Sequence, residues 1–239
     1  MTLELTEKQK QFNAAMELYA SHPAYKLFGT CVAVANVSLQ GWLLWRIWPF
    51  EIGVGAQMLA IVMAWVLADF LNGLVHMYMD NNDRYDSLDG PLIANFHLHH
   101  KTPLYTPLSL PMVYFVESGS KVWLAPCLAV VALLTLVDGI SPILLHVLVY
   151  TGVLSSVAEV SHYLCHTSVS PVSILLGNCG ILLSKRRHAV HHLTDNVGYA
   201  FLNGLTDPLI DIIASRLSHG YKQHTDLHYA AYLVDKKSR

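Results

Sequence analysis

The chain has 239 residues, of which 53% are hydrophobic and only 13% are charged, and its formal net charge is −2. A mean hydropathy of +0.38 favours a membrane protein over the alternative, a large soluble bundle of fully buried helices. The near-neutral charge gives no support to nucleic-acid binding. The four cysteines are scattered without a C-x-x-C pair, so they predict neither a disulfide framework nor a zinc ribbon.

Four stretches are long and apolar enough to cross a membrane as helices, namely residues 27–48, 55–79, 122–140 and 142–160. Such a helix needs about 20 apolar residues to cross about 30 Å of hydrocarbon. A fifth apolar stretch, 104–116, is interrupted by prolines, so we expect it either to lie at the membrane interface or to begin the third helix. These patterns predict an all-α integral membrane protein with about four transmembrane helices.

No repeat, low-complexity run or linker divides the chain. We therefore expect an N-terminal arm over residues 1–26, a membrane domain over 27–218 and a C-terminal tail over 219–239. Lysine and arginine are concentrated at the two ends of the chain, whereas the predicted turns after the first and third spans have only Arg46 near them. Because basic residues favour the cytoplasmic side, both termini of this multi-pass protein are expected in the cytoplasm.

Four histidine-rich segments are predicted to meet at the cytoplasmic membrane boundary. They are the end of the second span, "NFHLHH" at 95–100, "SHYLCH" at 161–166 and "HAVHH" at 188–192. Histidines three or four positions apart share one face of a helix and can bind one metal. Eight histidines belong to this set: His76, His99, His100, His162, His166, His188, His191 and His192. Zinc sites use three or four protein ligands, so eight imidazoles predict a two-metal site.

The motifs of several other metal sites are absent from the sequence. It contains neither H-E-x-x-H nor C-x-x-C-H, and the spacing Glu-x-x-His occurs once, from Glu159 to His162. Soluble carboxylate-bridged di-iron proteins use that spacing twice. The pattern therefore favours a di-iron site dominated by histidine, with Glu159 as an extra ligand or as an acid that orients one.

Two acids and one further histidine lie near the predicted ligands. Asp69 stands inside an apolar run, where an acid costs about 2.5–3.5 kcal/mol. We expect it either to accept the N–H of a ligating histidine or to make a polar contact between helices. Asp80 shares a helix face with His76 and is expected to bind metal, to orient a ligand or to end the helix. His97 is close to His99 but outside the shared pattern, and we regard it as a weaker candidate.

Four blocks of this sequence together resemble the Kua, or lipid desaturase, domain. They are "DFLNGLVHMYMDN" at 69–81, "FHLHHKTP" at 96–103, "HYLCH" at 162–166 and "RRHAVHHLTDNVGYAFLNGLTDPLID" at 186–211. Members of that family include plasmanylethanolamine desaturase and a plant plastid desaturase that acts on phosphatidylglycerol. The resemblance covers about residues 55–215. It implies iron ligands at the eight histidines and a role for Asp80 near the metals.

The chain also departs from the family pattern at two places. Some members have Pro-His where this chain has Asp195 and Asn196, which makes Asn196 a weaker candidate for a ligand or a water anchor. A Gly-Trp pair of the family is Gly204 and Leu205 here, so the resemblance does not fix the shape of the substrate channel.

The resemblance implies a lipid desaturase that uses two iron ions, O2 as co-substrate and an external electron donor of the cytochrome b5 or ferredoxin type. A site at the membrane boundary suits a phospholipid, whose chain enters an apolar tunnel. Lys185, Arg186 and Arg187 are expected either to bind the lipid phosphate or to anchor the chain at the cytoplasmic face.

We expect conversion of a plasmanyl (alkyl ether) phospholipid to a plasmenyl (vinyl ether) lipid. The alternatives are desaturation or hydroxylation of an acyl chain, and a non-catalytic membrane protein that stores or senses metal.

Overall fold

The computed structural model describes residues 6–103, 105–194, 196–218 and 228–237, and within these ranges every regular element is a helix. The predicted all-α class is therefore confirmed. In chain order the elements are α1 (Glu7–Ser21), α2 (Pro23–Ile47), α3 (Gly53–Asp80), α4 (Gly90–Lys101), α5 (Leu110–Glu117), the 3-10 helix η1 (Ser118–Ser120), α6 (Leu124–Leu134), α7 (Pro142–Thr167), α8 (Pro171–Asn178), α9 (Lys185–Leu193), α10 (Asp207–Leu217) and α11 (His228–Lys237).

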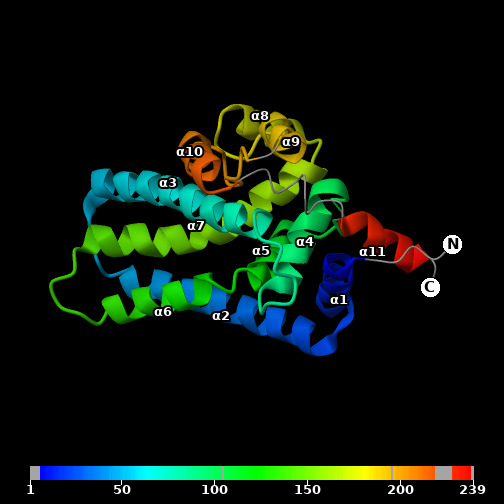
Figure 1. Ribbon diagram of the computed structural model, residues 1–239. Coiled ribbons are helices and arrows are strands. Elements are labelled where there is room, and N and C mark those ends of the chain that lie inside the picture. Colours follow the sequence, from blue (N-terminus) through cyan, green and yellow to red (C-terminus); the bar gives the residue numbers. More distant parts are fainter. Residues whose placement is uncertain (1–5, 104, 195, 219–227, 238–239) are drawn as a thin grey trace.

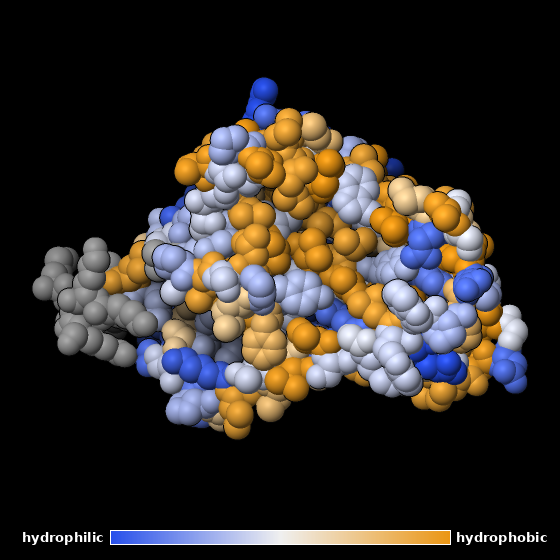
Figure 2. Space-filling view, turned by 180° about the vertical axis from the view of Figure 1, so that it is seen from behind, coloured by the Kyte–Doolittle hydropathy of each residue, from blue (hydrophilic) through white to orange (hydrophobic). Residues whose placement is uncertain are grey.

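Three helices, α2, α3 and α7, are long and apolar enough to cross a membrane. They correspond to the predicted spans 27–48, 55–79 and 142–160, and they confirm the expected multi-pass membrane protein. Figure 1 shows these helices side by side, with α1, α4 and α11 at one end of the molecule. Hydrophobic side chains are exposed over much of the face in Figure 2. Trp45 on α2 is 68% exposed and Val54 on α3 is 82% exposed, as expected of surfaces that face lipid.

The third predicted span, 122–140, differs from the expectation of one continuous helix. Its helix, α6, has only 11 residues, about 16 Å at 1.5 Å per residue, which is too short to cross a membrane alone. The preceding segment, α5 with η1, meets α6 at an angle of 94°. The two together can form one broken span, so the chain has three or four candidate spans.

The bend between α5 and α6 needs partners for backbone carbonyl groups, and Asn36 of α2 supplies them. Its Nδ2 donates to the carbonyl oxygen of Ser118 at 2.9 Å and to that of Lys121 at 3.1 Å. Gly119 permits the close approach, because a Cβ at this position would lie 2.6 Å from the carbonyl oxygen of Gly29. Backbone polar groups at membrane depth must be satisfied inside the protein, so this contact explains how the chain tolerates a break here.

Small residues allow α3 and α7 to pack closely. On α3, Ala60, Ala64 and Ala68 follow one another at intervals of four residues and are completely buried, as are Ser155 and Ala158 on α7. Helices in membranes associate through such small residues, because their backbones can then approach each other. The packing brings the C-terminal ends of α3 and α7 to the same end of the molecule, where α4 and α9 also lie (Figure 1).

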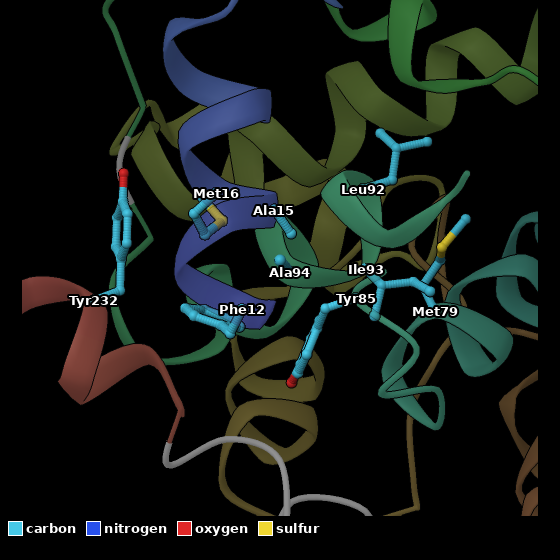
Figure 3. Close-up of a cluster of buried hydrophobic side chains, with 9 residues drawn as sticks. All are labelled: Phe12, Ala15, Met16, Met79, Tyr85, Leu92, Ile93, Ala94 and Tyr232. Atoms are coloured by element: carbon cyan, nitrogen blue, oxygen red, sulfur yellow. The ribbon is translucent and has the colours of Figure 1, made fainter. Parts of the chain in front are cut away.

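The first and last described helices, α1 and α11, pack against this region of the molecule. Phe12 of α1 lies 5.2 Å from Tyr85 and 6.1 Å from Tyr232 of α11, measured between ring centroids. Met16 and Ile93 belong to the same buried cluster, drawn in Figure 3. The predicted arm and tail therefore contain helices that pack on α4, although residues 219–227 of the tail lie outside the described residues.

We predict that Asn36→Leu destabilises the protein by about 1–3 kcal/mol, because two buried carbonyl groups lose their donor. The measurement is thermal unfolding of the purified protein in detergent. Ser38→Leu is the matched control, since Ser38 lies on the exposed side of the same helix. Equal melting temperatures for the two variants would contradict the assigned role of Asn36.

Candidate metal centre

Four helices bring all eight predicted histidines together. His76 lies in the last turns of α3, and the C-terminal end of α4 supplies His99 and His100. His162 and His166 come from the end of α7, and the remaining three belong to α9. Helix α9 begins where the Ser184 hydroxyl accepts the backbone N–H of Arg187 at 3.3 Å, and this cap starts the helix that aligns its histidines on one face.

The first cluster consists of His99, His162, His166 and His188, whose Nε2 atoms point toward one another. The Nε2 atoms of His99 and His166 are 3.0 Å apart, and those of His162 and His188 are 2.9 Å apart. His166 Nε2 also lies 2.7 Å from His188 Nε2 and 3.2 Å from His162 Nε2. One ligand atom from each residue lies within 4.8 Å of all the others, which is the arrangement of a four-ligand metal site.

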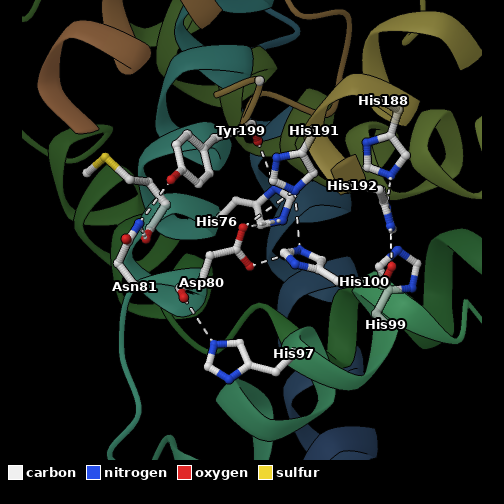
Figure 4. A network of polar contacts seen from close by, with 12 residues as sticks. His76, Asp80, Asn81, His97, His99, His100, His188, His191, His192 and Tyr199 are labelled. Carbon is white, nitrogen blue, oxygen red and sulfur yellow. Dashed lines mark hydrogen bonds and ion pairs between the residues drawn. The ribbon is translucent and has the colours of Figure 1, made fainter. Parts of the chain in front are cut away.

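The second cluster consists of His76, Asp80, His100 and His191, all of them buried. The Asp80 carboxylate is its centre (Figure 4). Its Oδ2 lies 3.3 Å from His76 Nε2 and 3.5 Å from His191 Nε2, and its Oδ1 lies 3.2 Å from His100 Nε2. The helical spacing of four residues explains why His76 and Asp80 reach the same point.

The eighth histidine, His192, adjoins both clusters. Its Nε2 lies 2.9 Å from His188 Nε2 of the first cluster, and its Nδ1 donates to the backbone carbonyl oxygen of His100 of the second, at 2.8 Å. The rings of His188 and His191 are stacked with centroids 5.5 Å apart, so the two clusters are neighbours. With Asp80, nine ligand-type side chains meet here, which is enough for two metal ions.

Hydrogen bonds to backbone carbonyls fix the tautomer of two histidines in the second cluster. Nδ1 of His76 lies 2.8 Å from the carbonyl oxygen of Tyr199, and Nδ1 of His191 lies 2.8 Å from that of Val197. A carbonyl only accepts, so the ring proton is on Nδ1 and the lone pair is on Nε2. Both lone pairs then face the carboxylate of Asp80. Such electron-rich atoms repel each other unless a cation lies between them, so these residues fit a metal ion.

The protonation of the histidines outside the spans also suits metal binding. Burial, followed by the neighbouring imidazoles, lowers the pKa of His99 and of His188 well below the usual histidine range. Both rings are therefore neutral at physiological pH. A histidine must be neutral to bind a metal, and an imidazole set fits iron as well as zinc or copper.

Asp69 does not reach the metal centre. Within the described residues its carboxylate accepts hydrogen bonds from the backbone N–H groups of Asn203, Gly204 and Thr206 at 2.9–3.2 Å, and from the Thr206 hydroxyl at 2.7 Å. It contacts none of the eight histidines. The carboxylate instead ties α3 to the segment that contains Tyr199, whose carbonyl group orients His76.

Three other candidates are also placed beside the clusters and not in them. His97 donates from Nε2 to the carbonyl oxygen of Asp80 at 3.1 Å and accepts at Nδ1 from the Tyr85 hydroxyl at 2.8 Å, so it holds the end of α3. Glu159 forms a salt bridge of 2.8 Å with Lys121. Asn196 has a left-handed backbone, with φ of 57°, and its side chain accepts from the Tyr199 hydroxyl. Asp195 lies outside the described residues.

The three basic residues before the last histidine block are exposed. Lys185 donates to the carbonyl oxygen of Cys165 at 2.8 Å, and Arg187 donates to the carbonyl oxygen of Gly204. These contacts hold α9 against the end of α7 and against the segment after it. Binding of a lipid phosphate by Lys185, Arg186 and Arg187 therefore stays a prediction.

Sequence reasoning missed two partners of the histidines. The Tyr105 hydroxyl lies 3.2 Å from His162 Nδ1, and the backbone of Tyr199 fixes His76. No spacing in the sequence signals Tyr105, because it stands in an irregular segment between α4 and α5. The contact of Tyr199 uses a carbonyl group, which every residue has.

The comparisons with known proteins agree with this geometry. The family model described as the lipid desaturase domain matches residues 65–217, well over half of the chain, and this range contains both clusters. The comparison with curated proteins finds no match, and the comparison with solved structures finds none either. The resemblance expected from the histidine blocks is thus confirmed at the level of this family, and the chain belongs to the lipid desaturase domain family.

Proposed function

We propose that this protein is an O2-dependent di-iron desaturase of intact membrane phospholipids, acting on the alkyl ether chain of a plasmanyl lipid. The observation that supports this most directly is the pair of adjacent four-ligand clusters in a chain of the lipid desaturase family. A protein that only stores or senses metal would not need an apolar cavity beside its ligands. One cavity, of about 350 Å³, is lined by His99 and His162 of the first cluster.

Each cluster would hold one iron ion. His99, His162, His166 and His188 would bind the first, and His76, Asp80, His100 and His191 would bind the second, with His192 beside His188. The chemistry supplied by bound iron is the activation of O2 and the oxidation of an unactivated C–H bond. Two hydrogens from adjacent carbons, two electrons from an external donor and two protons reduce O2 to two waters and leave one alkene. The donor would be of the cytochrome b5 or ferredoxin type.

The residues of this chain position the ligands and exclude water. The carbonyl groups of Tyr199 and Val197 keep His76 and His191 in the tautomer that turns Nε2 toward Asp80. Burial of the second cluster keeps bulk water away from its ligand atoms. Phe96 and Leu108 give the neighbouring cavity an apolar wall, which suits a hydrocarbon chain.

The position of the clusters supports oxidation close to the head group. They lie at the ends of α3 and α7, together with α1 and α11, and not at the middle of the spans (Figure 1). With both termini in the cytoplasm, this end would face the cytoplasmic leaflet and a soluble electron donor. In an ether lipid the carbons nearest the head group are the first two of the sn-1 alkyl chain. Their dehydrogenation gives a vinyl ether.

We predict that the purified protein contains about two iron ions per chain, and that His162→Ala and His76→Ala each remove iron. Activity should fall by more than the 10- to 100-fold that is typical for loss of an outer partner of a ligand. Metal analysis and turnover are the measurements. His22→Ala is the control, because His22 is exposed and outside both clusters.

Active protein with stoichiometric zinc and no iron would contradict the di-iron assignment. Normal turnover by well-expressed His162→Ala protein would show that the first cluster is assigned wrongly.

We predict that cells given an alkyl-ether lipid and expressing this chain accumulate a phospholipid that releases an aldehyde in mild acid, because acid hydrolyses a vinyl ether. Lipid mass spectrometry before and after acid treatment is the measurement, and His162→Ala cells are the control. An acid-stable loss of two hydrogens from an ester-linked chain would indicate an acyl desaturase. A gain of one oxygen would indicate a hydroxylase, and iron binding without any product would indicate a metal store or sensor.

A further inference from the structure

Two adjoining cavities lead from the surface of the protein to the first metal cluster. The outer cavity, of about 320 Å³, lies between α1, α2 and α5–η1, and Lys26 is at its exposed rim. The inner cavity, of about 350 Å³, reaches His99 and His162. Both are lined by Tyr19, Val116, Glu117 and Ser120, so these residues form the junction between them.

The junction contains an acid, Glu117, that forms no salt bridge with the described residues. Lys121 is buried and directs its ammonium group to Glu159 at 2.8 Å and to the side-chain oxygen of Asn72 at 2.5 Å. The carboxylate of Glu117 has no hydrogen bond or salt bridge among the described residues, although it lines both cavities. Two carboxylates thus share one cation, and a cationic group of a ligand would balance the second carboxylate.

The other groups of the outer cavity also suit a ligand with two charges. Tyr19, Tyr25 and Phe28 line it, with ring centroids 5.7 Å apart for the two tyrosines and 6.2 Å apart for Tyr25 and Phe28. Aromatic rings attract ammonium groups. Lys26 at the rim suits a phosphate, as basic residues at a membrane boundary do. A zwitterionic phospholipid head group contains an ammonium and a phosphate a few bonds apart.

We propose that the outer cavity binds a phospholipid head group that contains an amine, with the ammonium at Glu117 and the phosphate at Lys26, and that the chain continues into the inner cavity toward His99 and His162. Glu117 is then a specificity-determining residue. A glycerol head group would offer Glu117 only hydroxyl groups, so it should bind more weakly. The identity of the lipid as the reacting substrate rests on the function proposed above, whereas its selective binding does not require turnover.

The test compares three ether lipids that have identical chains and ethanolamine, choline or glycerol head groups. Each is mixed with the full-length, iron-loaded protein in detergent, and the retained lipid is quantified by mass spectrometry. The wild-type protein should retain the ethanolamine lipid about tenfold more strongly than the glycerol lipid, the effect of one charge-assisted hydrogen bond. The choline lipid, whose quaternary ammonium has no N–H to donate, should be retained less strongly than the ethanolamine lipid and more strongly than the glycerol lipid. The ethanolamine and choline lipids distinguish a hydrogen-bonded primary amine from a purely aromatic and electrostatic contact.

Variants assign the selectivity to particular residues. Glu117→Gln should bring the retention ratio close to one, and Glu117→Asp should restore part of it. Lys26→Gln should weaken all three lipids, because all contain phosphate. Glu51→Gln, an exposed acid between α2 and α3, is the matched control and should leave the ratio unchanged. Iron content and melting temperature verify that each variant is folded.

The proposal is overturned if the wild-type protein does not discriminate among the head groups, or if Glu117→Gln lowers the retention of amine and glycerol lipids equally. The comparison of head groups with the wild-type protein needs no variant. Misfolding of Glu117→Gln therefore does not prevent the test of head-group selectivity. Selective binding without any oxidised product would contradict the proposed desaturase activity alone. Product formation without head-group selectivity would contradict the head-group site alone.

Discussion

The structure is organised around electron-rich atoms that are held close together. Nε2 atoms of the first cluster approach one another to 2.7 Å, and in the second cluster two Nε2 lone pairs face the carboxylate of Asp80. Such contacts need a proton or a cation between the two atoms, so the scaffold has to hold these side chains firmly in place. Close packing of α3 on α7, the cap at Ser184 and the helices around α4 supply that rigidity. Preorganisation of this kind is what a metal site requires of its protein.

Asp69 influences the position of His76 indirectly, through the irregular segment between α9 and α10. An acid inside a transmembrane helix is costly, but here the carboxylate receives four hydrogen bonds from residues 203–206. A carboxylate accepting several backbone N–H groups is well stabilised even when buried. The bonds anchor an irregular segment to α3, and the same segment supplies the carbonyl group that orients His76. The interior acid therefore serves the metal centre without touching it.

Local periodicity explains which features were predictable from sequence. The apolar spans and the intervals of four residues, such as His162 to His166, depend only on the geometry of single helices. The division of seven of the eight histidines between two clusters depends on how four helices pack, and no spacing encodes it. The same holds for Asp80, for which the sequence allows several roles, and for Asp69, whose partners lie more than 130 positions away. The break before α6 was missed because α2 stabilises it through Asn36.

The break between α5 and α6 also positions two charged residues near the first cluster. Glu117 ends α5 and Lys121 follows η1, so the bend places an acid and a base at its two sides. Lys121 reaches α7 at Glu159, one helical turn before His162, while Glu117 lines both cavities. The buried salt bridge costs desolvation energy that a hydrophobic pair would avoid, which argues for a role beyond stability. Lys121 pairs with Glu159, whereas Glu117 has no salt bridge among the described residues and lies where the two cavities beside His99 and His162 meet.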